Sequence, residues 1–278
     1  MKTKKSTKAL AAVYAFLMFL FIYIPTFVMM VYSFNEQAAN KWWTGFTTDW
    51  YSKLMHDSQL WGYFTTSLKI SLTATLIVVV VGTLGAMGLS RYRFFGKNAL
   101  TFSVYIPMIV PGVVFSISIM SLLALMGIHK GFHSVVLGNV ILMLPYMILT
   151  VRTRFLGFDT SIEEASMDLG ANGITTFFRI TLPNILPGIF TGALLCFALT
   201  LDDVVMADFL AGSNCMTFPL KVYNSVKRGV SPEINALETI LSGLIMLGVI
   251  IYLIRENRRR QVPEGSEEIP GETAESAI

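Results

Sequence analysis

The sequence has little charge for its length. Only 14% of its 278 residues are Asp, Glu, Lys or Arg, whereas soluble domains carry about 25%. Hydrophobic residues make up 54%, and the few charges are clustered, which leaves long uncharged runs between them. A water-soluble globular protein is therefore excluded, and the composition indicates a membrane protein.

The sequence also lacks the residue patterns of most enzymes and metalloproteins. It has only two cysteines, Cys196 and Cys215, without a CxxC spacing, and His129 and His133 have no third ligand nearby. There is no P-loop, no GxSxG and no HExxH. We therefore expect no metal, no cofactor and no catalytic site in this chain. Uphill transport would need energy from a partner or an ion gradient.

Six segments are long and apolar enough to cross a membrane, since a spanning helix needs about 20 residues. We predict an all-α polytopic protein with spans at roughly 9–33, 66–90, 100–126, 134–151, 186–208 and 236–254. Gly82, Gly85 and Gly88 lie on one face of the second span and predict close helix packing. The basic start of the first span resembles a signal peptide, but its apolar run is longer than such a peptide carries, so we expect an uncleaved anchor.

Basic residues set the expected orientation. With the N-terminus inside, 14 of the 21 Lys and Arg residues fall in cytoplasmic segments, as the positive-inside rule requires. We expect both termini in the cytoplasm, a transmembrane domain over 1–260 and a disordered tail over 261–278.

The first outer loop contains all four tryptophans, including Trp42, Trp43 and Trp50. Indole rings favour the membrane interface, so one interpretation places this loop on the outer headgroups. The other interpretation is a docking surface for an external partner.

The longest cytoplasmic loop, 159–188, has the pattern of a short capped helix. Ser161 stands three residues before Glu164, as in a capping box, so we expect the helix to begin at Ile162. Glu163 and Glu164 favour the positive end of the helix dipole, and Gly170 is placed to end the helix in the left-handed conformation. A second amphipathic turn, 174–180, leads back to the membrane.

This loop resembles the EAA loop of ABC importer permeases. The matching residues are Glu164-Ala165-Ser166, then Gly170, then Ile180, Leu182 and Pro183 after nine residues, with Ser166 in place of the usual Ala. The resemblance implies the type I importer permease fold. It also implies that the loop, 159–185, couples the permease to a cytoplasmic ATPase, so that ATP is bound by that partner and not by this chain.

Other segments narrow the resemblance to the C-type membrane subunit of spermidine/putrescine importers. They are the first outer loop, the run Leu201–Val205 and residues 219–240. The resemblance implies a bacterial inner-membrane location and three kinds of partner: a related second permease, an ATPase dimer and an external polyamine-binding protein.

Two adjacent carboxylates, Asp202 and Asp203, fall in the outer third of the fifth predicted span. A charge within a span is unfavourable unless it faces a cavity or a partner, and carboxylates suit a chain of ammonium groups. We expect them on the substrate pathway, although they also fit the end of the span or a pair with lysines of the second permease.

Some alternatives stay open. Gly112 follows Pro111 where polyamine permeases often carry an acidic residue, so an opine, another amine or iron are alternative substrates. A self-sufficient secondary transporter would need internal repeats and an ion site near the midplane, and the sequence shows no repeat.

Overall fold

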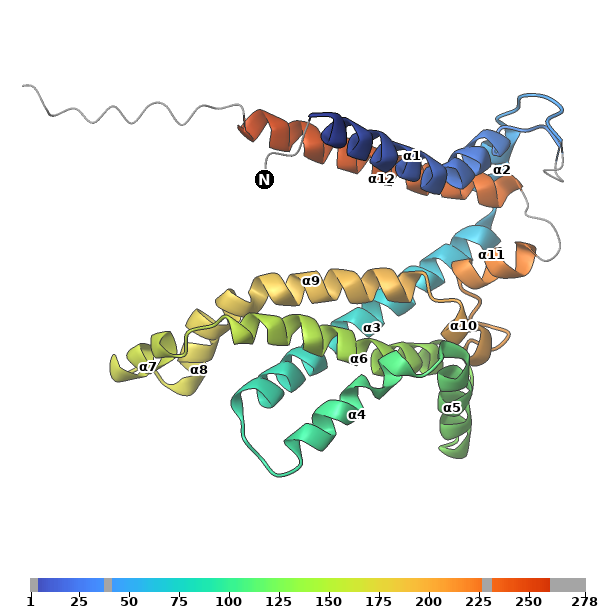
Figure 1. The fold of residues 1–278 in the computed structure, drawn as a ribbon. Coiled ribbons are helices and arrows are strands. Elements are labelled where there is room, and N and C mark those ends of the chain that lie inside the picture. Colours follow the sequence, from blue (N-terminus) through green and yellow to red (C-terminus); the bar gives the residue numbers. More distant parts are fainter. Residues whose placement is uncertain (1–4, 38–41, 227–231, 261–278) are drawn as a thin grey trace, which may run out of the picture. The chain divides into compact units, whose positions relative to one another are not determined.

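The computed structural model describes residues 5–37, 42–226 and 232–260, and it is helical almost throughout (Figure 1). The described residues contain no strand, only an isolated bridge between Asn35 and Phe46. The expected tail, 261–278, lies outside the described residues. The helices are α1 (Lys5–Tyr32), α2 (Asp49–His56), α3 (Ser58–Arg91), α4 (Lys97–Ile109), α5 (Gly112–Leu125), α6 (Phe132–Leu156), α7 (Ser161–Asp168), α8 (Gly173–Thr176), the π-helix η1 (Phe177–Thr181), α9 (Leu182–Leu201), α10 (Val205–Leu210), α11 (Phe218–Val226) and α12 (Pro232–Arg260).

Five of the described helical segments are long and apolar enough to span a membrane, and a bent pair brings the number to six. The bent pair corrects the third predicted span, because α4 and α5 meet at an angle of 113° instead of forming one helix. The break lies at Val110 and Pro111, both in extended conformation. A proline disfavours helical geometry at the residue before it, which explains where α4 ends.

Several predicted spans are shorter than the helices that contain them. Helix α3 begins at Ser58 because the Asp57 carboxylate accepts hydrogen bonds from the backbone amides of Gln59 and Leu60, each at 3.0 Å. Hydropathy detects only the apolar part of such a helix. The fifth span is displaced as well: its helical path runs from Gly173 to Leu201, so it ends before the two aspartates.

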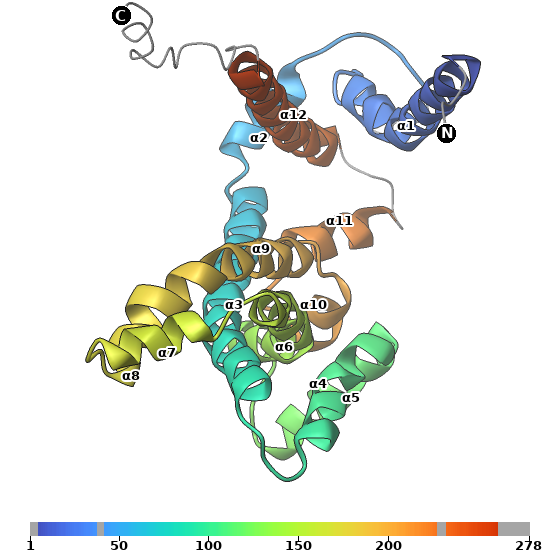
Figure 2. The ribbon, with the colours of Figure 1, turned by 60° about the vertical axis from the view of Figure 1, so that its left-hand side comes forward.

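The described residues group into two compact units, 57–228 and the paired chain ends, 1–56 with 229–278. In the larger unit, α3, α6 and α9 pack together around a common core, as both ribbon views show (Figures 1 and 2). The core side chains include Val78 of α3, Met147 and Val151 of α6, and Ile185 of α9.

Glycines allow the close approach of these helices. A Cβ atom at Gly82 of α3 would lie 2.6 Å from Cγ of Met147. A Cβ atom at Gly192 of α9 would lie 2.6 Å from Sδ of the same methionine. Gly85 also packs on α6, against Ile148, but Gly88 has no neighbour within 4 Å. The predicted glycine face is thus a packing surface at two of its three positions.

In the smaller unit, α12 packs against α1 and α2. Trp50 of α2 is buried, and its indole nitrogen donates to the carbonyl oxygen of Asn35 at 2.7 Å. The Asn35 side chain donates to the carbonyl oxygen of Trp42 at 2.8 Å and accepts from the amide of Thr44 at 3.0 Å. These bonds fix the loop between α1 and α2.

Candidate functional site: a coupling loop and an outer carboxylate pair

The loop 159–185, called the coupling loop below, begins with the short helix α7. The backbone amide of Ser161 donates to the Asp159 carboxylate at 2.9 Å, and this bond lowers the pKa of Asp159. The amides of Glu163 and Glu164 donate to the carbonyl oxygen of Thr160. The expected capping box is therefore wrong: Ser161 is the first helical residue, one before the predicted start, and the cap is provided upstream of it.

Gly170 ends α7 as predicted. Its φ is +90°, a conformation that an L side chain disfavours. The amide of Ala171 donates to the carbonyl of Ser166 at 3.1 Å, and the amide of Gly170 donates to the carbonyl of Met167 at 2.9 Å. These two bonds form a Schellman motif.

The chain then returns to the membrane through α8, η1 and α9. The Asn172 side chain caps α8 by accepting from the amide of Thr175 at 2.8 Å. The Ser166 hydroxyl, at the one position that departs from the EAA pattern, lies 3.3 Å from the hydroxyl of Thr176. Leu182 and Pro183 begin α9, which follows η1 without a break in the helical path.

Glu163 is the buried acidic residue of α7, with 5% of its surface exposed, whereas Glu164 is exposed. Its carboxylate accepts hydrogen bonds from the guanidinium group of Arg91 and from the hydroxyl of Thr181. Burial alone would raise the pKa of Glu163, but these two bonds and the charge of Arg91 outweigh it, so the pKa is lowered. Glu163 is therefore ionised, and Arg91 is its counterion.

Arg91 also packs on two aromatic rings. Its guanidinium carbon lies 5.4 Å from the ring centre of Phe155 and 5.9 Å from that of Phe158, within the range of a cation–π interaction. The network of Arg91, Glu163, Thr181 and the two rings, called the Arg91 network below, joins the end of α3 and the end of α6 to α7 and η1. Sequence reasoning missed Arg91 and Thr181, because no local pattern connects residues 72 positions apart.

The rest of the coupling loop presents apolar side chains to its surroundings. Leu169 is 90% exposed and Ile174 is 72% exposed, and Ala165 and Ile180 are not buried. A cavity of about 360 Å³ lies beside them, lined by Arg91, Glu163, Met167, Ile174 and Phe178 among others. Exposed apolar groups of this kind are typical of a surface that a partner covers.

At the other end of α9, the two aspartates occupy a turn rather than a span. Asp202 caps the C-terminus of α9 and is exposed, whereas Asp203 is half-buried. One oxygen of Asp203 accepts from the amide of Met206 at 3.3 Å and caps α10. Their predicted position inside the span is therefore wrong, and the alternative, that they mark the end of the span, is confirmed.

Asp203 lies in a cluster of polar side chains that the sequence did not indicate. Asn139, Thr200 and Thr217 line the same gap, which has no room for a water molecule, and each is nine-tenths or more buried. Among the described residues, one carboxylate oxygen of Asp203 and one side-chain oxygen of each neighbour have no hydrogen-bond partner. Unpaired buried polar atoms are rare in proteins.

Gly112, the position that lacks the expected acidic residue, begins α5, which packs against α10. The Ser116 hydroxyl lies 3.3 Å from the sulfur of Met206. A Cβ atom at Gly112 would meet only a methyl group of Val205, at 4.0 Å. The structure therefore has room for a side chain here, close to the helix that Asp203 caps.

Of the three tryptophans considered for docking, Trp42 and Trp43 are exposed and Trp50 is buried. Lys53 lies over the Trp50 ring, 4.2 Å from its centre. Trp50 therefore stabilises the loop from inside, and of these three tryptophans only Trp42 and Trp43 are accessible to a docking partner. The described residues contain no group of three or more His, Cys, Asp and Glu side chains that could hold a metal ion.

Comparison with known proteins agrees with this architecture. The chain is 39% identical over 241 residues to the spermidine/putrescine transport system permease protein PotC of Escherichia coli, covering 87% of this chain and 89% of that protein. It is 37% identical over 238 residues to the PotC protein of Haemophilus influenzae, covering 86% and 93%. It is 36% identical over 251 residues to the putrescine transport system permease protein PotI of Escherichia coli, covering 87% and 89%.

Solved structures show the same fold. A chain of a bacterial ABC transporter involved in alginate import aligns with a TM-score of 0.68 and 18% identity, covering 92% of this chain and 99% of that one. A chain of the MetNI methionine ABC transporter aligns with a TM-score of 0.51 and 17% identity, covering 77% and 96%. Residues 78–255 match the family described as the binding-protein-dependent transport system inner membrane component. The chain belongs to this family of ABC importer permeases.

Proposed function

We propose that the chain is the permease subunit that carries polyamines across the inner membrane in an ATP-driven importer. The observation that supports this most strongly is the 39% identity, over 87% of the chain, to a spermidine/putrescine permease. The chemistry of the outer end of α9 agrees, because the carboxylates of Asp202 and Asp203 are acceptors for ammonium groups.

The energy comes from a separate ATPase dimer that docks on the coupling loop. Glu164, Ala165 and Gly170 form the face and the end of the docking helix, and Ile180, Leu182 and Pro183 carry the chain into α9. The side-chain contacts of the Arg91 network connect α7 to the ends of α3 and α6 and, through η1, to α9. A displacement of α7 on ATP binding is therefore passed to the membrane helices and not absorbed by the loop.

Three further features complete the proposal. Both termini lie in the cytoplasm, as the distribution of Lys and Arg favours. A related second permease supplies the other half of the pathway. An external binding protein delivers the polyamine, and the exposed indoles of Trp42 and Trp43 belong to its docking surface.

The test is uptake by cells that lack their own polyamine importers and express this chain with its partners. We expect accumulation of radiolabelled spermidine or putrescine, with competition by unlabelled polyamine. An opine, ferric iron and a neutral sugar serve as the competing solutes. Competition by one of these three alone, without competition by polyamines, would refute the polyamine assignment and leave the permease assignment standing.

A further inference from the structure

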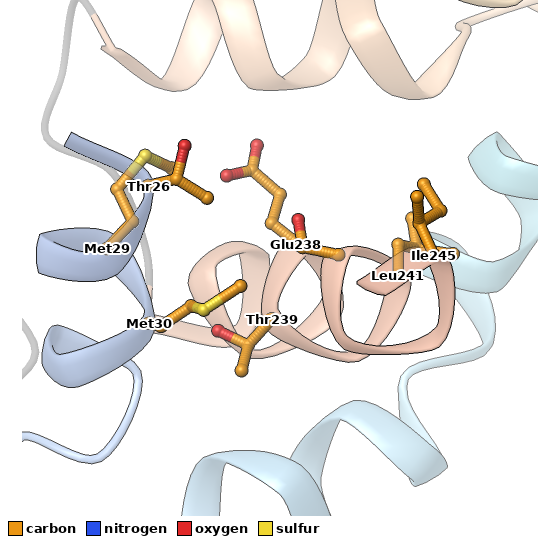
Figure 3. Close-up of a pocket in the computed structure, with 8 residues that line it drawn as sticks. Thr26, Met29, Met30, Glu238, Thr239, Leu241 and Ile245 are labelled. Atoms are coloured by element: carbon orange, nitrogen blue, oxygen red, sulfur yellow. The ribbon is translucent and has the colours of Figure 1, made fainter. Parts of the chain in front are cut away.

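Another carboxylate lies in the smaller unit, close to the start of the apolar helix α12. Glu238 belongs to α12, within the segment that is apolar enough to span the membrane. Its side chain faces a cavity of about 270 Å³ between α12 and α1 (Figure 3). The cavity, called the Glu238 cavity below, is lined by Thr26, Met29 and Met30 of α1 and by Glu238, Thr239 and Ser242 of α12, among others.

No described residue pairs with this carboxylate. Glu238 takes part in no ion pair and no hydrogen bond among the residues that the structure describes. A charged side chain within a span is unfavourable by up to about 2.5–3.5 kcal/mol at the helix centre, and by less near an end, where Glu238 lies. Such a residue is a candidate functional site and usually faces a partner charge or a cavity. Glu238 faces a cavity.

The lining of the cavity has the chemistry of an alkylammonium site. Figure 3 shows the Glu238 carboxylate and Thr26 approaching the cavity from α12 and α1 respectively. Ser242 adds a second hydroxyl on α12, whereas the Thr239 hydroxyl already donates to the carbonyl of Asn235 at 2.7 Å. The carboxylate and the hydroxyl oxygens accept N–H groups. The thioethers of Met29 and Met30 are polarisable and adaptable, which suits a flexible methylene chain.

We infer that the Glu238 cavity is a cation subsite that binds one ammonium group and the adjoining methylenes of the transported polyamine. The inference rests on the proposed polyamine function. The volume is slightly below that of drug-sized pockets, about 300–1,000 Å³, so it suits part of a slender chain rather than a whole bulky solute. Glu238 replaces part of the hydration that the ammonium group loses on leaving water.

The test uses the complete complex of both permeases, the ATPase and the binding protein, reconstituted in lipid vesicles. Uptake of spermidine is measured at saturating loaded binding protein for the wild type, Glu238→Gln and Glu238→Asp. The matched control is Glu233→Gln, which removes the same charge five residues earlier on α12 and outside the cavity. Thr26→Val is the second variant, because it removes the facing hydroxyl while keeping the shape of the side chain.

We expect Glu238→Gln to lower spermidine uptake about tenfold, the factor that corresponds to losing 1.4 kcal/mol from a charge-assisted contact. Glu238→Asp restores much of the loss, Thr26→Val shows a smaller loss, and Glu233→Gln transports normally. Assembly and basal ATP hydrolysis stay unchanged in the control Glu233→Gln.

Three outcomes would overturn the inference. Wild-type uptake in Glu238→Gln would show that the carboxylate has no part in the route. An equal loss in Glu233→Gln would show a general effect of charge on α12. Loss of the second permease from the purified Glu238→Gln complex would show that Glu238 pairs with a cationic side chain of that subunit. If the wild type takes up no polyamine, the proposed function itself fails, whereas normal wild-type uptake with unaltered Glu238→Gln refutes only this site.

Discussion

The Arg91 network makes a sharp prediction, because the chain provides a matched control two residues away. Arg91→Met removes the guanidinium group that pairs with Glu163, while a long apolar side chain remains over the rings of Phe155 and Phe158. Arg93→Met removes the same charge from an exposed side chain outside the Arg91 network. Any effect specific to the network therefore appears in the first variant and not in the second.

The magnitude follows from the burial of the pair. The side chain of Glu163 is 7% exposed and that of Arg91 is 29% exposed, so the pair lies between a surface ion pair and a fully buried one. A surface pair contributes about 0.2–1 kcal/mol, and breaking a buried pair costs about 3–5 kcal/mol. Hydrogen bonds to charged groups contribute about 1.5–3 kcal/mol, which is the range we adopt for Arg91→Met.

A loss of about 1.5 kcal/mol lowers the ratio of anchored to detached α7 about tenfold. Amide hydrogen exchange over residues 161–170 in the reconstituted complex measures this ratio directly, because exchange follows local opening. We expect about tenfold faster exchange in Arg91→Met, together with fewer polyamine molecules transported per ATP hydrolysed. Glu163→Gln keeps an acceptor oxygen for Thr181 and should accelerate exchange less than Arg91→Met does. The effects of the two substitutions in the double variant, Arg91→Met with Glu163→Gln, should be less than additive.

Exchange in Arg91→Met that equals exchange in Arg93→Met would refute the anchoring role. The pH dependence gives an independent check. Because the pKa of Glu163 is lowered, its ionised form stabilises the loop above the ordinary carboxyl pKa, about 4.3. This stabilisation is lost only as the pH falls through the lowered value. Protection of α7 should therefore be constant between about pH 6 and 8.

Three other predictions follow from the same geometry. Gly170→Val forces a β-branched residue to φ +90°. The variant should insert normally but should lower the uptake per ATP hydrolysed more than Gly170→Asn does, as paired uptake and ATPase assays would show. Asp203→Asn should reduce spermidine uptake more than Asp202→Asn, because only Asp203 joins the buried polar cluster; equal uptake by wild type and both variants contradicts this. Gly82→Leu should destabilise the larger unit by about 1–3 kcal/mol through overpacking and should therefore lower its melting temperature. An unchanged melting temperature contradicts the packing role.

The sequence predicted the parts of the coupling loop that depend on local rules. Gly170 adopts the expected conformation because a glycine takes a positive φ without strain and commonly ends a helix in this way. The start of α7 was missed by one residue, because Asp159 and Thr160 compete with Ser161 for the same capping role. Both capping patterns are local, and sequence spacing alone does not decide between them.

Long-range relations were not predictable in the same way. The pairing of Arg91 with Glu163 depends on α3, α6 and the coupling loop meeting in space, and neither residue carries a pattern that points to the other. The bend between α4 and α5 had a local signal, Pro111, but hydropathy averages across it. The end of α9 was misplaced for the same reason, because Val204 and Val205 continue the apolar run after the helix has ended.

The central claim is that this chain couples ATP hydrolysis on a separate subunit to polyamine import. The most direct measurement is spermidine uptake and ATP hydrolysis, followed together in vesicles that contain this chain, the second permease and the ATPase, with loaded binding protein on the outer side. We predict accumulation that stops when ATP, the binding protein or the ATPase is omitted, and uptake that falls relative to ATP hydrolysis in Arg91→Met. Accumulation that continues without the ATPase, driven by an ion gradient, would contradict the claim.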